Sequence, residues 1–283
     1  MAHADPQVVL VTGCSTGIGR ALVRELRTQG MRVFASARRP ESIADLSAEG
    51  IETIRLDVND TASIREAVAT GLERAGRIDA LVNNAGMNLI GPMAELPLEN
   101  LRAILETNVI GLVAAAQAVI PSMAARGRGR IVNVGSVVGI LPTPYAGAYC
   151  ASKAAVHSLS DVLRMEVAPF GIDVVVVQPG GVRSAISETG SSDIERYRTE
   201  GSLYRAGWDG IHKRAWASQQ GAMPAEDFAR EMVAQAFADP APRLIRLGTG
   251  SDSLPRMAEL PGEERDAMLS ASFGLEALRR TPG

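Results

Sequence analysis

The residues best suited to acid–base chemistry are a tyrosine and a lysine four positions apart, Tyr149 and Lys153. The apolar spacing around them predicts a helix, and residues four apart share one helix face. A free tyrosine has a pKa of about 10, which a neighbouring ammonium group and the start of a helix should lower. Ser136 follows a short apolar strand, and its hydroxyl could bond a carbonyl oxygen. The three side chains therefore suit proton exchange with an alcohol or a carbonyl.

A glycine-rich turn near the N-terminus has the context of a phosphate-binding loop. It lies between a predicted strand, Val8–Thr12, and a predicted helix that begins near Ile18. Gly13 would permit the tight turn, Gly17 the close approach of a pyrophosphate, and Gly19 the packing of the helix on the strand. The spacing is G-xxx-G-x-G rather than G-x-G-x-x-G. The expected cofactor-binding residues of this turn are Gly13, Ser15, Thr16, Gly17, Ile18 and Gly19.

The end of the next predicted strand favours NADP(H) over NAD(H). Enzymes that use NAD normally carry an acid there, which bonds the ribose hydroxyls. This chain has Ala37 followed by Arg38 and Arg39. A guanidinium can hold a 2′-phosphate with two hydrogen bonds, so Arg38 is the expected clamp, with Thr16 as a possible helper.

Each of these features also has an explanation without chemistry. Tyr-x-x-x-Lys pairs arise by chance in helices, and Ser136 could be an ordinary turn serine. The glycine turn could bind no ligand, and Arg38 and Arg39 could be solvated surface charges.

The elements that must position these residues alternate between strands and helices. Continuous β-branched runs are typical of parallel strands covered on both faces, and the alternation predicts right-handed βαβ units. The expected fold is a single-domain α/β Rossmann fold over residues 1–283, with a doubly wound, mostly parallel, seven-stranded sheet. The predicted strands are Val8–Val11, Arg32–Ser36, Glu52–Leu56, Ala80–Val82, Arg130–Val134, Ile172–Val177 and Arg243–Leu247. The predicted helices are Ile18–Gln29, Thr61–Glu73, Leu98–Arg126, Tyr149–Pro169 and Ala225–Ala238.

The alternation stops after Pro179. Residues 180–222 are rich in Gly, Ser and charge, and a long irregular segment in a compact domain is usually a functional lid or a disordered loop. The tail over residues 251–283 looks helical. The predicted lid contains Tyr197, Tyr204 and Trp208. Together with the apolar stretch Val137–Ala148, these aromatic residues favour a hydrophobic ketone or aldehyde as substrate.

Composition excludes several other classes. The net charge of −3 argues against a nucleic-acid-binding surface. The two cysteines, Cys14 and Cys150, make neither a disulfide framework nor a zinc site and are expected to be packing residues. No metal site is expected. No signal peptide is expected, and the apolar run Val109 to Ile120, interrupted by Gln117, is too short to cross a bilayer. A cytoplasmic location is the expectation.

In combination these motifs resemble the short-chain dehydrogenase/reductase family over about residues 7–184. The residues that carry the resemblance are the Thr12–Gly19 turn, Asn83-Asn84-Ala85-Gly86, Asn108, Ser136, Tyr149, Lys153 and Pro179-Gly180. The segment Tyr149–Ser184 is similar to the branch that contains 17β-hydroxysteroid, retinal and acyl-dihydroxyacetone-phosphate reductases. The resemblance also implies a homodimer or homotetramer.

The resemblance assigns roles to individual residues. It implies a catalytic set of Asn108, Ser136, Tyr149 and Lys153, in which Asn108 holds a water that links Lys153 to solvent. The further cofactor contacts that it implies are Asp57, Val58, Asn84, Ala85, Gly86, Tyr149, Lys153, Pro179, Gly180, Val182 and Ser184. Ser184 stands where the family often has threonine. Arg183 has no assigned role, and His157 is expected to pack at the surface of its helix.

The expected activity is hydride transfer between NADP(H) and a carbonyl or secondary alcohol, in the direction of reduction. Two alternatives stay open. The same site could work as an alcohol dehydrogenase, because cofactor ratios rather than the site set the direction. The chain could instead be a catalytically idle NADP-binding scaffold or redox sensor.

Overall fold

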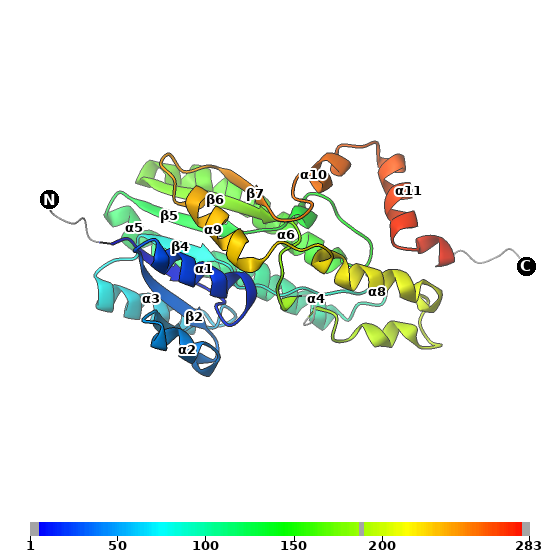
Figure 1. Cartoon of the computed structure of the whole chain (residues 1–283), viewed down its shortest axis with the longest axis horizontal. Coiled ribbons are helices and arrows are strands. Elements are labelled where there is room, and N and C mark those ends of the chain that lie inside the picture. Colours follow the sequence, from blue (N-terminus) through cyan, green and yellow to red (C-terminus); the bar gives the residue numbers. More distant parts are fainter. Residues whose placement is uncertain (1–5, 187–189, 279–283) are drawn as a thin grey trace, which may run out of the picture.

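The computed structural model describes residues 6–186 and 190–278, and its centre is a seven-stranded sheet in which every pair of strands is parallel. The strand order is β3-β2-β1-β4-β5-β6-β7, which is a doubly wound Rossmann fold. The strands are β1 Val8–Val11, β2 Arg32–Ala37, β3 Glu52–Arg55, β4 Ala80–Asn83, β5 Gly129–Val134, β6 Ile172–Pro179 and β7 Leu244–Leu247. The predicted class and the predicted parallel sheet are confirmed, and Figure 1 shows the sheet between its helices.

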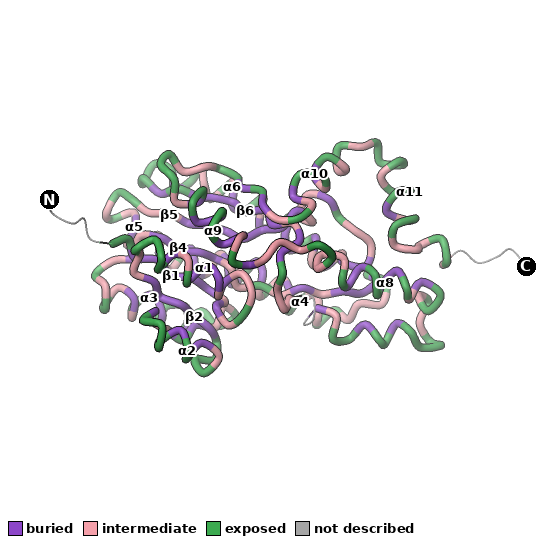
Figure 2. Tube along the Cα trace, viewed as in Figure 1, coloured by how far each residue is buried: buried purple, intermediate pink, exposed green. Residues whose placement is uncertain are grey.

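Helices cover both faces of the sheet because its side chains are apolar on both sides. Helices α1 (Gly17–Thr28) and α9 (Ala225–Ala236) pack together over one core, which includes Val11, Val132 and Phe228. Helices α3 (Thr61–Ala75), α5 (Gly111–Ala125) and α6 (Gly147–Val167) border the other core. Figure 2 shows the buried strands enclosed by these half-exposed helices.

Two short elements that the sequence did not predict lie between β2 and β3. They are the 3-10 turn η1 (Pro40–Ile43) and helix α2 (Ala44–Ala48). Helix α6 begins at Gly147, two residues before the predicted start, and this places Tyr149 in its first turn. The apolar pattern defined the helix, but the cap residues carried no clear signal.

The predicted helix Leu98–Arg126 is continuous but not uniform. It consists of α4 (Leu98–Leu105), a π-turn over Glu106–Ile110 and α5. Among the described helices, the segment Leu98–Ala125, with 28 residues, is the one that is long and apolar enough to span a membrane. The apolar run Val109 to Ile120, considered in the sequence analysis, is only part of this segment. The segment packs against α3, β4 and β5. Such packing is what the core helix of a globular domain shows.

The predicted lid is mostly helical rather than irregular. Its elements are η5 (Ile194–Arg198), η6 (Arg205–Gly207), α8 (Trp208–Trp216) and η7 (Ala217–Gln219); residues 187–189 lie outside the described part. The periodicity was missed because these elements are short. The tail is helical as expected, with α10 (Ser253–Ala258), α11 (Gly262–Ser272) and η8 (Leu275–Leu278). Figure 1 shows α8 and α11 on the same side of the molecule, beyond the end of the sheet.

Candidate active site

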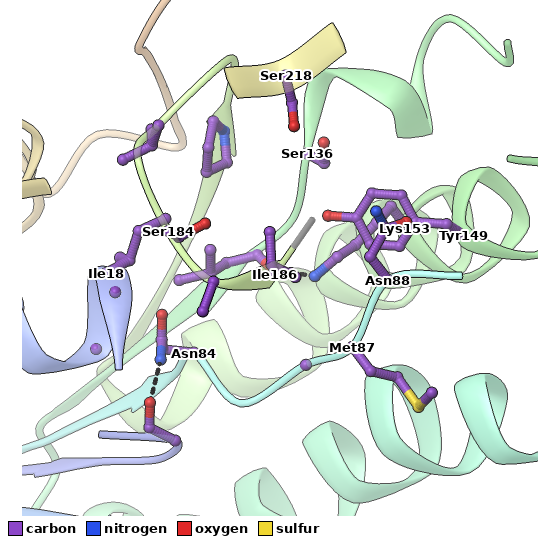
Figure 3. Close-up of a pocket in the computed structure, with 18 of the residues that line it drawn as sticks. Ile18, Asn84, Met87, Asn88, Ser136, Tyr149, Lys153, Ser184, Ile186 and Ser218 are labelled. Carbon is purple, nitrogen blue, oxygen red and sulfur yellow. Dashed lines mark hydrogen bonds between the residues drawn. The ribbon is translucent and has the colours of Figure 1, made fainter. Parts of the chain in front are cut away.

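A cavity of about 770 Å³ lies along the carboxyl ends of the strands, where open α/β sheets bind ligands. It collects every predicted site residue except Asn108. These are Gly13, Ser15, Thr16, Gly17, Ile18, Gly19, Arg38, Arg39, Asp57, Val58, Asn84, Ala85, Gly86, Ser136, Tyr149, Lys153, Pro179, Gly180, Val182 and Ser184. Figure 3 shows Ile18, Asn84 and Ser184 toward one end of the cavity, and Ser136, Tyr149 and Lys153 toward the other.

The glycine turn packs too tightly against its neighbours to hold side chains. Gly13 and Gly17 have φ of 73° and 55°, in the left-handed region that favours glycine. A Cβ at Gly13 would lie 2.7 Å from the Ala85 Cα, and one at Gly17 would lie 2.9 Å from the Ser184 Cβ. A Cβ at Gly19 would collide with the Gly13 carbonyl oxygen. Without side chains the backbone of this turn and the start of α1 face the cavity directly. Such a glycine cradle at a helix N-terminus suits a pyrophosphate and so fits a dinucleotide.

Asn84 and Thr12 hold this turn against β4. The Asn84 amide donates to the carbonyl oxygens of Thr12 and Gly13, each at 3.0 Å. The Thr12 hydroxyl in turn accepts hydrogen bonds from the backbone N–H groups of Asn84 and Ala85. Figure 3 shows one hydrogen bond of Asn84 as a dashed line. The predicted role of Asn84 in securing the central strands therefore has a defined geometry.

The acid–base group lies at the end of β5 and the start of α6. Lys153 is buried, and its ammonium group donates to the Val134 carbonyl oxygen at 2.8 Å and lies 5.8 Å from the centre of the Tyr149 ring. Burial raises the pKa of Tyr149 to about 12, while the Ser136 hydroxyl and the charge of Arg214 act in the opposite direction. Burial also lowers the pKa of Lys153 to about 8.

The expectation that Lys153 lowers the pKa of Tyr149 is not met. Burial of the phenol is the larger effect, so the tyrosine is protonated near neutral pH. A protonated phenol can donate a proton, but the raised pKa makes Tyr149 a weaker acid than a free tyrosine. The lysine charge gains importance only when the phenol ionises.

Asn108 lies behind the cavity rather than on its wall. The π-turn directs its side chain to Met87, whose N–H donates to the Asn108 Oδ1 at 2.8 Å and whose carbonyl accepts from Nδ2 at 2.9 Å. The same Nδ2 also lies 2.9 Å from the Ser152 hydroxyl. Asn108 therefore ties the segment after β4 to α6, next to Lys153. π-Turns inside α-helices are frequent at functional sites, and sequence patterns do not reveal them.

His157 contradicts the prediction of a surface position. Its Nε2 accepts a long hydrogen bond, 3.4 Å, from the backbone N–H of Ser136. A Cβ at Gly139 would lie 2.6 Å from its ring. His157 thus supports the turn that presents Ser136. Burial lowers its pKa from 6.5 to about 4, with the Lys153 charge acting in the same direction.

The half-buried imidazole of His157 predicts acid sensitivity. The unfolded chain binds a proton at His157 near pH 6.5 and the folded chain only near pH 4, so stability falls as pH falls between these values. We expect His157→Gln to lose up to about 3 kcal/mol less free energy of unfolding than the wild type when the pH is lowered over this range. Urea unfolding at pH 7 and pH 4.5 measures it, with exposed His212→Gln as control. Equal acid sensitivity of all three proteins would contradict the assignment.

Other residues of the site escaped the sequence analysis because they come from the lid. The Gln219 amide donates to the Val182 carbonyl at 3.2 Å, and its oxygen accepts from the Ser184 N–H at 3.3 Å. Arg214 reaches the cavity from α8. No motif pointed to either residue. A polar residue on the apolar face of a short helix could have indicated Arg214. That face can be recognised only after the helix itself has been predicted.

Fold and site together define a nucleotide-binding oxidoreductase with a tyrosine–lysine–serine centre. The family described as short chain dehydrogenase matches residues 7–195. The chain belongs to this family.

Relatives place the chain in the predicted branch. It is 37% identical over 187 residues to the 3-ketodihydrosphingosine reductase of Bacteroides thetaiotaomicron, which covers 65% of this chain and 67% of that protein. It is 37% identical over 199 residues to human 17-beta-hydroxysteroid dehydrogenase type 1, covering 64% and 58%. It is 38% identical over 180 residues to the NADPH-dependent 1-acyldihydroxyacetone phosphate reductase of Schizosaccharomyces pombe, covering 63% and 60%. The chain thus matches less than two thirds of the length of the last two relatives.

Solved structures agree over more of the chain. A short-chain dehydrogenase from Streptomyces avermitilis superposes with a TM-score of 0.78 at 31% identity, covering 98% of both chains. A family member from Burkholderia phymatum, in complex with NAD, has a TM-score of 0.78 at 25% identity and covers 95% and 97%. A serine dehydrogenase complexed with NADP+ has a TM-score of 0.74 at 28% identity and covers 87% and 96%. Structures with 25% to 28% identity to this chain therefore include one complex with NAD and one with NADP+.

Proposed function

We propose that this oxidoreductase of alcohols and carbonyls uses NADP(H) and works chiefly as a reductase of ketones or aldehydes with apolar groups. The observation that carries the proposal is the convergence of Tyr149, Ser136 and Lys153 at one end of a cavity whose other end is a glycine cradle followed by Arg38. A bound nicotinamide supplies the hydride. The rest of the chemistry falls to the protein.

The three side chains have different roles, which follow from their positions and from the protons they carry. The Ser136 hydroxyl bonds the carbonyl oxygen of the substrate and fixes its position. Tyr149, protonated near neutral pH, gives its proton to that oxygen as negative charge develops there. Lys153 holds its charge beside the ring and stabilises the phenolate that remains. In the oxidative direction the same groups act in reverse.

The proposed cofactor contacts divide along the cavity. Arg38 and Arg39 are exposed at the end of β2, where they can reach a 2′-phosphate. Asp57 and Val58 follow β3 and would flank the adenine. Pro179, Gly180, Val182 and Ser184 follow β6 and would flank the nicotinamide, with their loop held by Gln219.

The wall beyond Tyr149 supports an apolar substrate. It includes Val137, Val138, Ile186 and Phe273. Next to it lies an apolar lid cluster of buried side chains. In it, Ile194, Tyr197, Ile211 and Ala215 of the lid pack with Ile90, Tyr145, Ala146 and Cys150. Tyr145 adopts φ of 63°, the one non-glycine residue of the described chain with positive φ, and such strain often accompanies function.

The direct test is a cofactor-consumption assay. NADPH and NADH are supplied in parallel with a panel of hydrophobic ketones and aldehydes, and the loss of reduced nicotinamide absorbance is followed. The proposal expects turnover with NADPH well above that with NADH. Turnover only of alcohols with NADP+ would favour the oxidative alternative, and cofactor binding without turnover in either direction would favour the idle scaffold or redox sensor.

We also propose that the chain forms a homodimer or homotetramer through α6. This helix exposes an apolar stripe of Leu159, Val162 and Met165, which are 40%, 44% and 59% exposed. We expect the wild-type protein to elute as an oligomer in size-exclusion chromatography with light scattering, and Val162→Asp to shift it to a smaller species. Leu203→Asp, which changes an exposed leucine of the lid, is the control. A monomeric wild type would contradict the proposal.

A further inference from the structure

The substrate end of the cavity contains a buried cation that the chemistry above does not use. Arg214 lies on the inner face of α8, between Ile211 and Ala215 of the apolar lid cluster, and only 6% of it is exposed. The adjacent Lys213 is exposed on the outer face of the same helix. An arginine is seldom buried without a partner, because a charge is costly to remove from water.

The described chain offers Arg214 no carboxylate. Within residues 6–186 and 190–278 its hydrogen bond is to the Thr143 hydroxyl, which accepts from Nε at 2.8 Å, and no ion pair forms. The ionisable groups that act on the pKa of Arg214 are Cys150 and Tyr149, and neither is a carboxylate. The one acid among the described lining residues is Asp57, which follows the edge strand β3 and is far along the sheet.

The orientation of the guanidinium leaves its fork available. The Nε group donates to the Thr143 hydroxyl. The two Nη atoms are not among the fully enclosed polar atoms without a partner, so they are open to the cavity. Arg214 lines the cavity together with Thr143, Tyr149 and Ser136. The two Nη groups are the donors that bind carboxylate or phosphate oxygens in pairs. Lys153 is not such a donor, since it bonds Val134 and stands beside the Tyr149 ring.

We propose that Arg214, held in place by Thr143, binds an oxyanion group of the substrate. The substrate class is then an oxo acid or an oxo phosphate ester with an apolar remainder. Its carbonyl lies at Ser136 and Tyr149, its anionic group lies on Arg214, and its apolar part lies against Val138 and Phe273. This inference rests on the proposed function and narrows its substrate.

A purely structural arginine would behave differently. If Arg214 served only to tie α8 to Thr143, Arg214→Met would lower thermal stability. If it is kept for a ligand, removing an unpaired buried charge while keeping its apolar stem should leave the melting temperature unchanged or raise it. Arg214→Lys keeps the charge without the fork. Lys213→Met is the matched control, because it removes a cation from the exposed face of the same helix.

The kinetic test compares each acid with its neutral ester. Benzoylformate and methyl benzoylformate, and acetoacetate and methyl acetoacetate, are assayed with NADPH and the four proteins. We expect Arg214→Met to lower kcat/KM for the acids by about 30-fold or more and for the esters by less than about 3-fold. Arg214→Lys should fall between, and Lys213→Met should match the wild type. Equal losses on acid and ester would overturn the inference and show that Arg214 acts through Tyr149.

A binding test separates this inference from the proposed function. Thermal shifts are measured for the NADP+-saturated proteins with benzoate, phenyl phosphate and neutral benzamide. We expect benzoate or phenyl phosphate, but not benzamide, to stabilise the wild type and Lys213→Met, with the effect lost in Arg214→Met. The stronger of the two anions identifies carboxylate or phosphate. Arg214-dependent anion binding without turnover of any carbonyl would support the anion site and contradict the proposed function. Turnover of neutral ketones with no Arg214-dependent anion binding would do the reverse.

Discussion

Replacement of Tyr149 by Phe is expected to lower kcat by about 10³-fold while NADPH binding changes little. The variant removes only the hydroxyl that gives its proton to the substrate oxygen. The ring stays in place, so the cavity keeps its shape and Lys153 keeps its bond to Val134. The measurement is steady-state turnover, with cofactor affinity followed by the fluorescence of bound NADPH.

The control for this variant is Tyr204→Phe. Tyr204 belongs to the lid and packs edge-on against Tyr145, 6.2 Å between ring centres, outside the cavity lining. The Tyr204→Phe variant should keep full turnover. If Tyr149→Phe turned over its substrate at the wild-type rate, the proton donor would have to be another group, and the role of Ser136 would need to be reconsidered as well.

The second large effect concerns the choice of cofactor. Arg38→Asp should lower kcat/KM for NADPH by about 10- to 100-fold, because a charge-assisted hydrogen bond to phosphate is lost and a repulsive charge takes its place. The same carboxylate can bond the ribose hydroxyls of NADH. The ratio of the two specificity constants should therefore move toward NADH. Initial rates with both cofactors at one ketone concentration measure it.

Arg55→Asp is the matched control for the cofactor variant. Arg55 is exposed on the neighbouring strand β3, paired in register with Ala37, and does not line the cavity. It should leave the ratio unchanged. An unchanged ratio in Arg38→Asp, with a changed one in Arg39→Asp, would transfer the clamp to Arg39. No change in either would remove both arginines from the proposed site.

The features that the sequence predicted well depend on local rules. The strand positions follow from β-branched runs, and the cradle follows from glycines whose φ or close packing excludes a side chain. Tyr149 and Lys153 meet because one helix turn separates them. In each case the residues that interact are near one another in the chain or occupy a known motif.

The features that the sequence missed depend on contacts between distant segments. His157 reaches a turn 21 residues earlier, and Arg214 reaches Thr143 across 71 residues. The pKa of Tyr149 was predicted from its lysine neighbour, but burial, which no local pattern reports, is the larger effect. The π-turn at Asn108 was hidden because the apolar spacing of its helix continues through it.

The central claim is that the cavity transfers hydride from NADPH to a carbonyl carbon. The most direct measurement uses NADPH carrying deuterium at both hydrogen positions of C4 of the nicotinamide, with methyl benzoylformate as acceptor and mass spectrometry of the alcohol product. We expect one deuterium at the carbinol carbon with the wild type and none above background with Tyr149→Phe. Bound NADPH that yields unlabelled alcohol, or no alcohol from any ketone, aldehyde or oxo acid supplied, would contradict the claim.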